Sequence, residues 1–147
     1  MPAKREDPLV GFTFMLDLSS KATGYFTEVT GIGSEHEVIE HKVVDNGHET
    51  VLKVPGRLKW SDITLKRGIT SDMKIWDWRQ KVEEGKVDDA RTNGSIVMLG
   101  RDYKEVARWN FTNGWPSKVT GPILKSDSNE FGIEEMVIVH EGMTRAK

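Results

Sequence analysis

The stretch "VGFTFMLDL", residues 10–18, decides the fold class because apolar residues recur at every second position along it. Valine, phenylalanine and leucine occupy the even positions, while Gly11, Thr13 and Asp17 lie between them. A period of two is typical of a β-strand with one buried face. We therefore expect a β-rich domain whose first strand buries its even-numbered side chains.

The remaining chain continues this strand pattern, with one exception. Strands are expected in "YFTEVT", "DITLKRG", "SIVMLG", "EVARWNFT" and "NEFGIEEMVIVHEG". In the last of these, Phe131, Ile133, Val137 and Val139 are expected to share one face. A loop is expected after "EVARWNFT", through Pro116, Gly121 and Pro122. The pattern predicts a mostly β domain with a single helix, of the sandwich or partly closed barrel kind.

The exception is "TSDMKIWDWRQKVEEGKV", residues 70–87, which predicts an α-helix. Thr70 or Ser71 is expected to cap its N-terminus, and Gly85 suits the C-terminal cap. Its apolar side chains fall at helical spacing, so one face is expected to be buried: Ile75, Trp78 and Val82, widened by Met73 and Trp76.

A second segment, "SEHEVIEHKVVDNGHETVLKVPG", predicts a β-hairpin with its turn at Asn46-Gly47. Asn-Gly is a strong hairpin signal because both residues tolerate positive φ. Charged residues are frequent in both strands, so the hairpin is poorly suited to packing on its own core. We expect it to project over about residues 37–53 and to pair with another molecule.

Length and composition limit the classes of function. The 147 residues fit one domain, 1–147, with a polar N-terminal arm over residues 1–8. The formal net charge is only −2, so no strongly basic field attracts nucleic acid. There is no cysteine, which excludes disulfides and thiolate chemistry. The basic N-terminus lacks an apolar run behind it, so neither a signal peptide nor a membrane anchor is expected.

Catalytic and metal-binding motifs are weak. The segment "EHEVIEH" contains His36, Glu40 and His41, but the two histidines point to opposite faces of a strand. "GIGSEH" lacks the third glycine of a dinucleotide fingerprint. A hydrolase using His140 with Glu141 or Asp17 is conceivable, and so is a monomeric barrel for a small apolar ligand, but no set of convergent groups supports either. We expect no catalytic residue, cofactor or metal.

The tryptophans separate into two groups. Trp76, Trp78 and Trp109 are expected in the core, because they lie on periodic apolar faces. Trp115 lies between Gly114 and Pro116, so its backbone is restricted to an extended form. Trp115 is expected either in the core or at a subunit interface.

Six segments occur in an order and spacing that resemble a known family: "DPLVGFTFMLDL", "FTEVTGIGSE", "VPGRLKWSDITLKRG", "IWDWR", "GSIVML" and "ARWNFTNGWPSK", followed by a closing "HEG". Together they resemble the tail tube proteins of contractile phages. They are most similar to the inner-tube subunit of extracellular contractile injection systems. The resemblance covers about residues 7–143.

The resemblance implies two packed antiparallel β-sheets with one helix at the side. It implies six-subunit rings that stack into a tube around a lumen, surrounded by a sheath and joined to baseplate, spike and cap proteins, with effector proteins as cargo. It implies assembly in the bacterial cytoplasm and release as an extracellular particle. The alternatives are the DNA-conducting tube of a phage and the tube protein of a cell-anchored secretion system. The expected interface residues are Asp45, Asn46, Gly47, His48, Glu49, Trp115 and Pro116.

Overall fold

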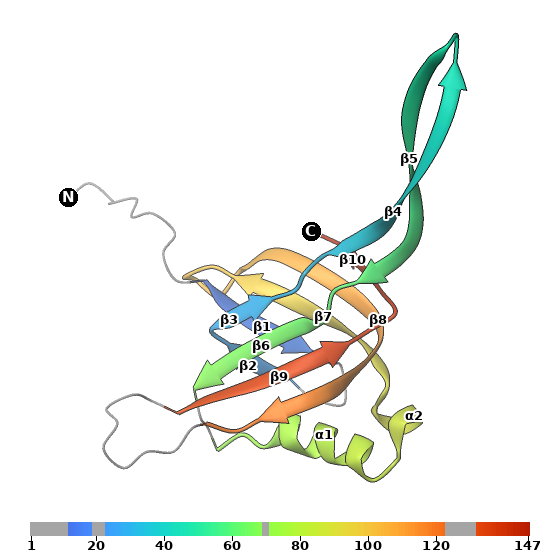
Figure 1. The fold of residues 1–147 in the computed structure, drawn as a ribbon. Coiled ribbons are helices and arrows are strands. Elements are labelled where there is room, and N and C mark those ends of the chain that lie inside the picture. The colour runs from blue at the N-terminus through green and yellow to red at the C-terminus, as the bar shows by residue number, and fades with distance from the viewer. Residues whose placement is uncertain (1–11, 19–22, 69–70, 123–131) are drawn as a thin grey trace, which may run out of the picture.

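The computed structural model describes residues 12–18, 23–68, 71–122 and 132–147, and the chain in these ranges is mostly β (Figure 1). Three features named in the sequence analysis lie outside the described residues: the N-terminal arm over residues 1–8, the possible helix cap Thr70, and Phe131. The strands are β1 (Thr13–Asp17), β2 (Thr23–Phe26), β3 (Glu28–Thr30), β4 (Ser34–Asp45), β5 (His48–Trp60), β6 (Ile63–Gly68), β7 (Thr92–Leu99), β8 (Glu105–Thr120), β9 (Ile133–Val139) and β10 (Gly142–Arg145). The helices are α1 (Lys74–Glu83) and α2 (Val87–Ala90).

The main sheet is antiparallel and folds back on itself as two packed halves. Its strand order is β2-β1-β7-β8-β9-β6-β3, and β10 also pairs with β8. Only Thr27 separates β2 from β3, and its backbone N–H donates to the Lys66 carbonyl at 2.9 Å. Because β2 pairs with β1 and β3 pairs with β6, this short segment joins the two ends of the sheet. The result is a small barrel, as the alternating strands predict.

The barrel interior is filled with side chains. Leu16 and Leu18 of the first predicted strand are fully buried, and Phe14 packs against them, which confirms the predicted even-numbered face. Several other strands contribute residues with at most 1% exposure: Phe26, Ile63, Leu65, Ile96, Phe111, Met136 and Ile138. The space inside the barrel is therefore a packed core.

The predicted face of β9 is wrong. Ile133 is 56% exposed, and Val137 and Val139 are only partly buried. The opposite face points inward and buries Met136 and Ile138. The inward face contains a charged residue, Glu134, which is buried because it pairs with the Arg67 side chain. Glu134 interrupts the apolar pattern of the inward face, so the sequence favoured the opposite face.

The predicted loop is wrong in its first part, at Pro116, because β8 continues from Glu105 to Thr120, whereas Gly121 and Pro122 do lie outside the strand. Its first part pairs with β7 and its last part with β9, so this strand passes from one half of the sheet to the other. The change of partner falls between Gly114, which still pairs with Thr92, and Trp115, which pairs with Val139. Asn113, just before it, has a φ of 51°, and a register shift follows Pro116. Bends and bulges let one strand turn a sheet corner, and a bulge tolerates proline. "TNGWPSK" is thus a corner within a strand.

Helix α1 lies across one end of the barrel (Figure 1) and buries Ile75 and Trp78, as predicted. The Trp78 Nε1 donates to the Ala90 carbonyl at 2.7 Å, which links α1 to α2. Gly85 follows the helix with φ 84°, as its predicted cap role requires. Met73 is 62% exposed, so the predicted widening of the buried face includes Trp76 only.

The predicted N-terminal caps of this helix are wrong. Met73 stands at the N-cap position without a side-chain hydrogen bond. The Asp72 Oδ1 accepts a hydrogen bond from the Lys74 backbone N–H at 3.0 Å. Asp72 therefore provides the side-chain acceptor at the start of the helix that was expected from Ser71. The additional helix α2 was not predicted, because four residues are too few for a periodic signal.

A buried polar network fastens α1 to the barrel. Arg67 of β6 donates from Nε to the Glu134 Oε2 at 3.1 Å, and both side chains are about 95% buried. The other Glu134 oxygen accepts the Trp76 Nε1 at 3.0 Å, while Arg67 also donates to the Asp72 carbonyl at 2.9 Å. The network therefore connects β6, β9 and the start of α1.

Candidate assembly surface

The β4–β5 hairpin is the largest feature outside the barrel and extends well away from it (Figure 1). Its strands pair from Ser34↔Trp60 to Asp45↔His48, so the hairpin is longer than the predicted 37–53 segment. Asn46 and Gly47 have φ values of 52° and 76°, the positive pair that a two-residue hairpin turn requires. Every residue from 34 to 59 is exposed except Val43 and Gly56, which are partly buried.

The pairing register divides the hairpin into two faces, since residues directly opposite each other point the same way. On one face Ile39 opposes Val54, and the next pairs along are His41↔Leu52 and Val43↔Thr50. No lysine, arginine or glutamate interrupts these three pairs. We call this the apolar face of the hairpin, defined by Ile39, Val43, Leu52 and Val54.

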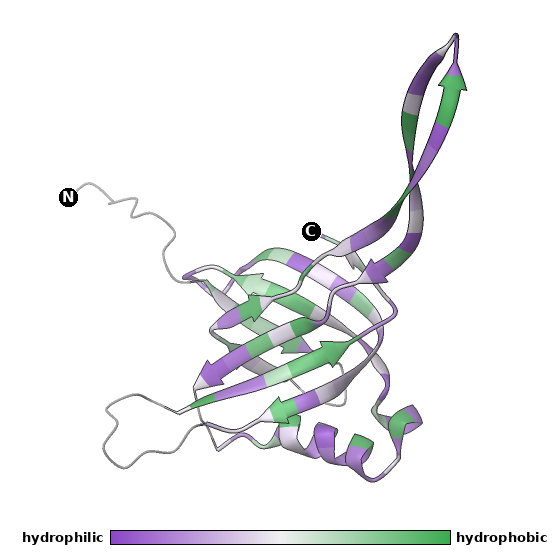
Figure 2. Ribbon diagram, in the orientation of Figure 1, coloured by the Kyte–Doolittle hydropathy of each residue, from purple (hydrophilic) through white to green (hydrophobic). Residues whose placement is uncertain are grey.

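The opposite face is mixed and carries charges in complementary positions. Glu40 lies opposite Lys53, and the Lys42 Nζ is 3.9 Å from a Glu49 oxygen. Val51 and Val44 lie opposite Lys42 and Glu49, and Val38 pairs with Pro55 beyond the Glu40–Lys53 pair. We call this the charged face. Figure 2 shows green and purple segments alternating along both strands, the pattern of a two-sided ribbon.

The apolar face was not predicted from the sequence, because charged residues are frequent in both strands. The signal was available, because a two-residue turn at Asn46-Gly47 fixes the register of every pair behind it. Ile39, Leu52 and Val54 are 48%, 49% and 42% exposed, a concentration of apolar surface that a soluble protein usually covers with a partner.

The predicted interface residues at the hairpin tip occupy one continuous place. Asp45, Asn46, Gly47, His48 and Glu49 are all exposed around the turn. Asp45 pairs with His48, and no neighbouring atom lies within 4 Å of a side chain that would be added at Gly47. Glu49 also lies 3.9 Å from the Lys42 Nζ, and all five residues are exposed to contact by a second molecule.

The other two predicted interface residues, Trp115 and Pro116, lie at the sheet corner and differ from each other. Trp115 pairs with Val139 and is only partly buried. Pro116 is buried opposite Ile138, and its carbonyl accepts a hydrogen bond from the Arg79 Nη1 at 3.2 Å. Pro116 therefore shapes the strand that presents Trp115, and its own ring is covered within the chain.

The predicted core position of Trp109 holds in part. Its side chain packs against the core cluster but remains partly exposed, and the Arg145 guanidinium lies over its ring at 5.6 Å. Trp76 is likewise partly buried, whereas Trp78 is 2% exposed and fully inside.

The base of the hairpin is attached to the barrel by aromatic contacts. The His140 ring lies 5.8 Å from the Trp60 ring and 6.1 Å from the Phe111 ring, measured between centroids. Its Nε2 donates to the Ser61 carbonyl at 3.1 Å. Directly beside it, the Ser61 N–H donates to the Gly33 carbonyl. These contacts fix the first residues of β4 and the last residues of β5 relative to the barrel.

Those contacts also bear on the hydrolase alternative. His140 is engaged with Ser61, and Glu141 accepts the Asn113 Nδ2 at 2.6 Å. Among the described residues, no group of three or more His, Asp or Glu side chains is placed to hold a metal ion. His36 and His41 extend along β4 in the exposed hairpin.

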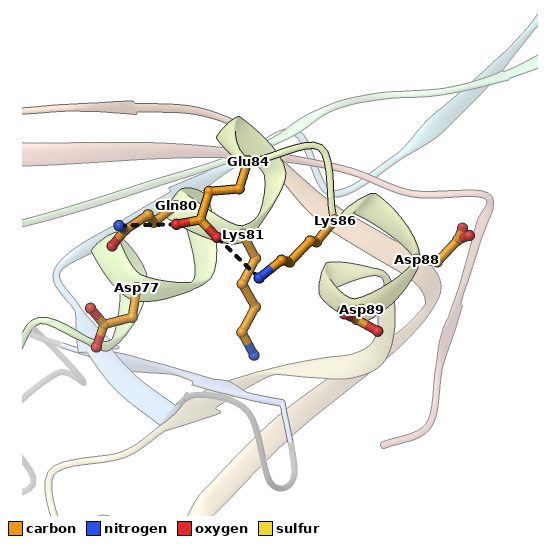
Figure 3. Close-up of a pocket in the computed structure, with 7 residues that line it drawn as sticks. All are labelled: Asp77, Gln80, Lys81, Glu84, Lys86, Asp88 and Asp89. Atoms are coloured by element: carbon orange, nitrogen blue, oxygen red, sulfur yellow. Dashed lines mark hydrogen bonds and ion pairs between the residues drawn. The ribbon is translucent and has the colours of Figure 1, made fainter.

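The structure also has a groove between α1 and α2, lined by charged and amide side chains (Figure 3). Glu84 pairs with its own neighbours there, accepting the Gln80 Nε2 at 3.2 Å and lying 3.4 Å from the Lys86 Nζ. Within the described ranges, no helix has the length and apolar character needed to span a membrane.

Comparison with known proteins agrees with this architecture. The chain matches the family model of T4-like virus tail tube protein gp19 over residues 10–144. A comparison with curated protein sequences found no match.

Solved structures show the same fold. A chain in the PVC sheath–tube complex of an extracellular contractile injection system, in its extended state, has a TM-score of 0.76 at 20% identity, over 95% of this chain and 92% of that one. A chain in the tube-terminating cap of the anti-feeding prophage has the same TM-score and identity, over 99% and 95%. Hcp1 from Flavobacterium johnsoniae is more distant, at 0.57 and 13%, over 93% and 95%.

Proposed function

Because the chain belongs to the T4-like virus tail tube protein gp19 family, we propose that it is the inner-tube subunit of a contractile injection system. In this proposal six copies form a ring, and rings stack into a tube whose lumen carries cargo. The observation that carries the proposal is the β4–β5 hairpin, which is exposed over almost its whole length and has an apolar face.

The hairpin supports assembly by its shape and its chemistry. It stands clear of its own barrel, so a contact with its apolar face must come from another molecule. Burying one partly exposed aliphatic side chain contributes on the order of 1 kcal/mol. A six-fold ring repeats each contact six times, so modest single contacts suffice for a stable stack. We infer that the apolar face lies against a subunit of the adjacent ring.

The corner at Trp115 supports the same arrangement. Trp115 pairs with Val139 across the sheet, and Val139 directly precedes His140, which contacts Ser61 and Trp60 at the base of the hairpin. Trp115 is thus suited to receive a neighbouring subunit at the rim of the barrel. Buried aromatic residues of this kind often contribute strongly to interfaces.

The proposed partners are the sheath around the tube and the baseplate, spike and cap at its ends. The solved structures with the same fold come from a sheath–tube complex, a cap and a baseplate. We propose that effector proteins are the cargo, that the protein has no catalytic role, and that the assembled particle acts outside the cell that makes it. A phage tail tube that conducts DNA is the second candidate, favoured by the family's own description.

Electron microscopy of the purified chain tests the proposal. We expect six-fold rings or tubes, and a mass of six subunits or multiples of it in solution. A matched variant lacks residues 44–49, which removes the exposed tip and leaves the barrel intact. It should stay folded and stack poorly. A wild-type chain that is only monomeric at all concentrations, or a shortened chain that builds normal long tubes, would contradict the proposal.

A further inference from the structure

The chain contains three Asn-Gly pairs, which are Asn46-Gly47, Asn93-Gly94 and Asn113-Gly114. Such a pair is open to an internal reaction, because glycine has no side chain that would keep its backbone nitrogen away from the asparagine side-chain carbonyl. Asparagine is among the thermolabile residues of proteins. Since the three pairs have the same local chemistry, a difference in their reactivity comes from the fold around them.

The reaction is a deamidation. The glycine nitrogen attacks the asparagine Cγ, so the N–Cγ bond forms and the Cγ–Nδ2 bond breaks. The side-chain nitrogen leaves as ammonia and takes the glycine N–H proton with it. Water then opens the resulting cyclic imide at either carbonyl, which yields aspartate or isoaspartate. The backbone must rotate to bring the two reacting atoms together, so the pair needs free space and a segment that can open.

Asn93 and Asn113 are held within the main sheet. The Asn93 Oδ1 accepts the Asn113 backbone N–H at 3.1 Å, and the Asn113 Nδ2 donates to a Glu141 oxygen at 2.6 Å. Both asparagines belong to strands with partners on two sides, since β7 lies between β1 and β8, and β8 lies between β7 and β9. Rotation of the backbone at either pair therefore has to disrupt the sheet.

The glycines of the three pairs differ in the space around them. A Cβ added at Gly94 would overlap the Leu18 side chain, and one added at Gly114 would overlap the Phe111 ring. At Gly47 no atom lies within 4 Å of an added Cβ. Of the three pairs, the one at Gly47 therefore has room for a cyclic imide, which joins the side chain and the main chain in one ring.

The hairpin tip is also the easiest of the three places to open. Strands β4 and β5 form a two-stranded sheet of their own, and the tip stands far from the barrel (Figure 1). A hairpin without further packing is marginally stable in water. The ion pair near the tip, between Lys42 and Glu49 at 3.9 Å, is exposed and adds little stability. Local opening at the tip therefore costs less free energy than opening β7 or β8.

Either product of the reaction changes the tip. Aspartate adds a negative charge directly next to Asp45 and close in the chain to Glu49. Isoaspartate passes the main chain through the former side-chain carbonyl, which lengthens the turn by one carbon atom. Because the turn fixes the pairing register of the hairpin, the longer turn displaces the apolar face behind it.

We propose that Asn46 is a deamidation site of the free subunit and that assembly protects it. The site follows from the hairpin alone, whereas the protection rests on the proposed function, because the adjacent ring would hold the tip closed. A deamidated subunit stacks poorly, so the reaction limits how long an unassembled subunit stays competent for assembly. Asn93 and Asn113 stay intact in both states.

The test is an incubation of dissociated subunits and of tubes at mildly alkaline pH, where the attacking amide nitrogen loses its proton more readily. Peptide mass spectrometry separates the amide from the acid by mass and gives the converted fraction at each asparagine over time. In dissociated subunits Asn46 should convert at least about tenfold faster than Asn93 or Asn113, and in tubes its conversion should slow by about the same factor.

Asn46→Gly is the matched control, since Gly-Gly also suits a two-residue turn and has no side-chain amide to lose. Both chains are incubated as dissociated subunits, and each is then compared with its own tube yield before incubation. The wild type should lose yield in proportion to its converted Asn46, and Asn46→Gly should not. An equal loss in Asn46→Gly would overturn the link between deamidation and stacking.

The remaining outcomes separate the site from the tube. Equal conversion of the three asparagines in dissociated subunits would overturn the site. Conversion of Asn46 as fast in tubes as in subunits would overturn the protection and leave the tube function standing. A chain that forms no ring or tube would overturn the proposed function, while preferential conversion of Asn46 in its subunits would still support the site.

Discussion

At the scale of single residues, the buried ion pair between Arg67 and Glu134 is the most sensitive point of the barrel. Both side chains are about 95% buried, and without Glu134 the Arg67 guanidinium keeps only the more exposed Asp72 carboxylate, 3.9 Å away, to compensate its charge. We expect Glu134→Leu to lower the free energy of unfolding by about 3–5 kcal/mol, measured by urea denaturation. The double variant Arg67→Met/Glu134→Leu should recover most of that loss. A single variant as stable as the double one would contradict this account of the network.

The tryptophans provide a second comparison between residues. Trp78 is 2% exposed and bonded to the Ala90 carbonyl, so Trp78→Ala should cost about 3–5 kcal/mol of stability. Trp115 is partly buried at the corner, so Trp115→Ala should change folding less and assembly more. Thermal unfolding and tube yield, measured on both variants, separate these effects. Equal losses of stability in the two variants would place Trp115 in the core.

At the scale of elements, the two faces of the hairpin can be tested by matched substitutions. Ile39 and Val38 are adjacent on β4, 48% and 63% exposed, but they point to opposite faces. We expect Ile39→Asp, on the apolar face, to abolish stacking, while Val38→Asp leaves tubes intact. Leu52→Asp and Val51→Asp form the same comparison on β5. Because all four sites are exposed, subunit stability should change by no more than about 0.5 kcal/mol.

Tubes are counted by electron microscopy, and subunit folding is followed by circular dichroism. An equal loss of tubes in Ile39→Asp and Val38→Asp would contradict the prediction, because the contact with the adjacent ring would then not be specific to the apolar face.

Elements with a strong local signal could be predicted from the sequence. The alternation before Leu18, the Asn46-Gly47 turn and the apolar face around Trp78 depend on neighbours in the chain alone. The side of β9 that faces the core could not be predicted, because it depends on the distant partner Arg67 that compensates Glu134. The path of β8 through Pro116 was hidden for a similar reason, since proline in a strand requires a bulge that only the pairing with β9 reveals. The family resemblance predicts an assembly surface at the hairpin, and the structure adds the division of the hairpin into two faces.

At the scale of the whole molecule, the charges on the outward face of the β3–β6–β9–β8 half of the barrel can be tested by substitution. Glu28 lies opposite Lys66, Lys66 lies opposite Glu135, and Lys118 pairs with Val137 in the next row, so these four charges sum to zero. We call this face the wall and expect it to line the lumen of the proposed tube. Lys66→Glu and Lys118→Glu together would make the wall acidic and lower the formal net charge of the chain, −2 in the wild type, by about four. In a ring these charges would face one another across a lumen, so assembly should fail at low ionic strength and recover in salt, as the screening length falls from about 30 Å at 0.01 M to about 3 Å at 1 M.

The control carries the same change of charge elsewhere on the molecule, as Lys81→Glu with Lys86→Glu beside the groove between α1 and α2. Its tubes should depend on salt less steeply, because those positions do not face their symmetry copies across an enclosed space. Sedimentation of polymer over a series of salt concentrations measures both. If the two double variants show the same salt dependence, the repulsion follows from net charge alone, and the wall is not the enclosed surface. A steeper dependence in the wall variant alone would place the β3–β6–β9–β8 face inside the tube.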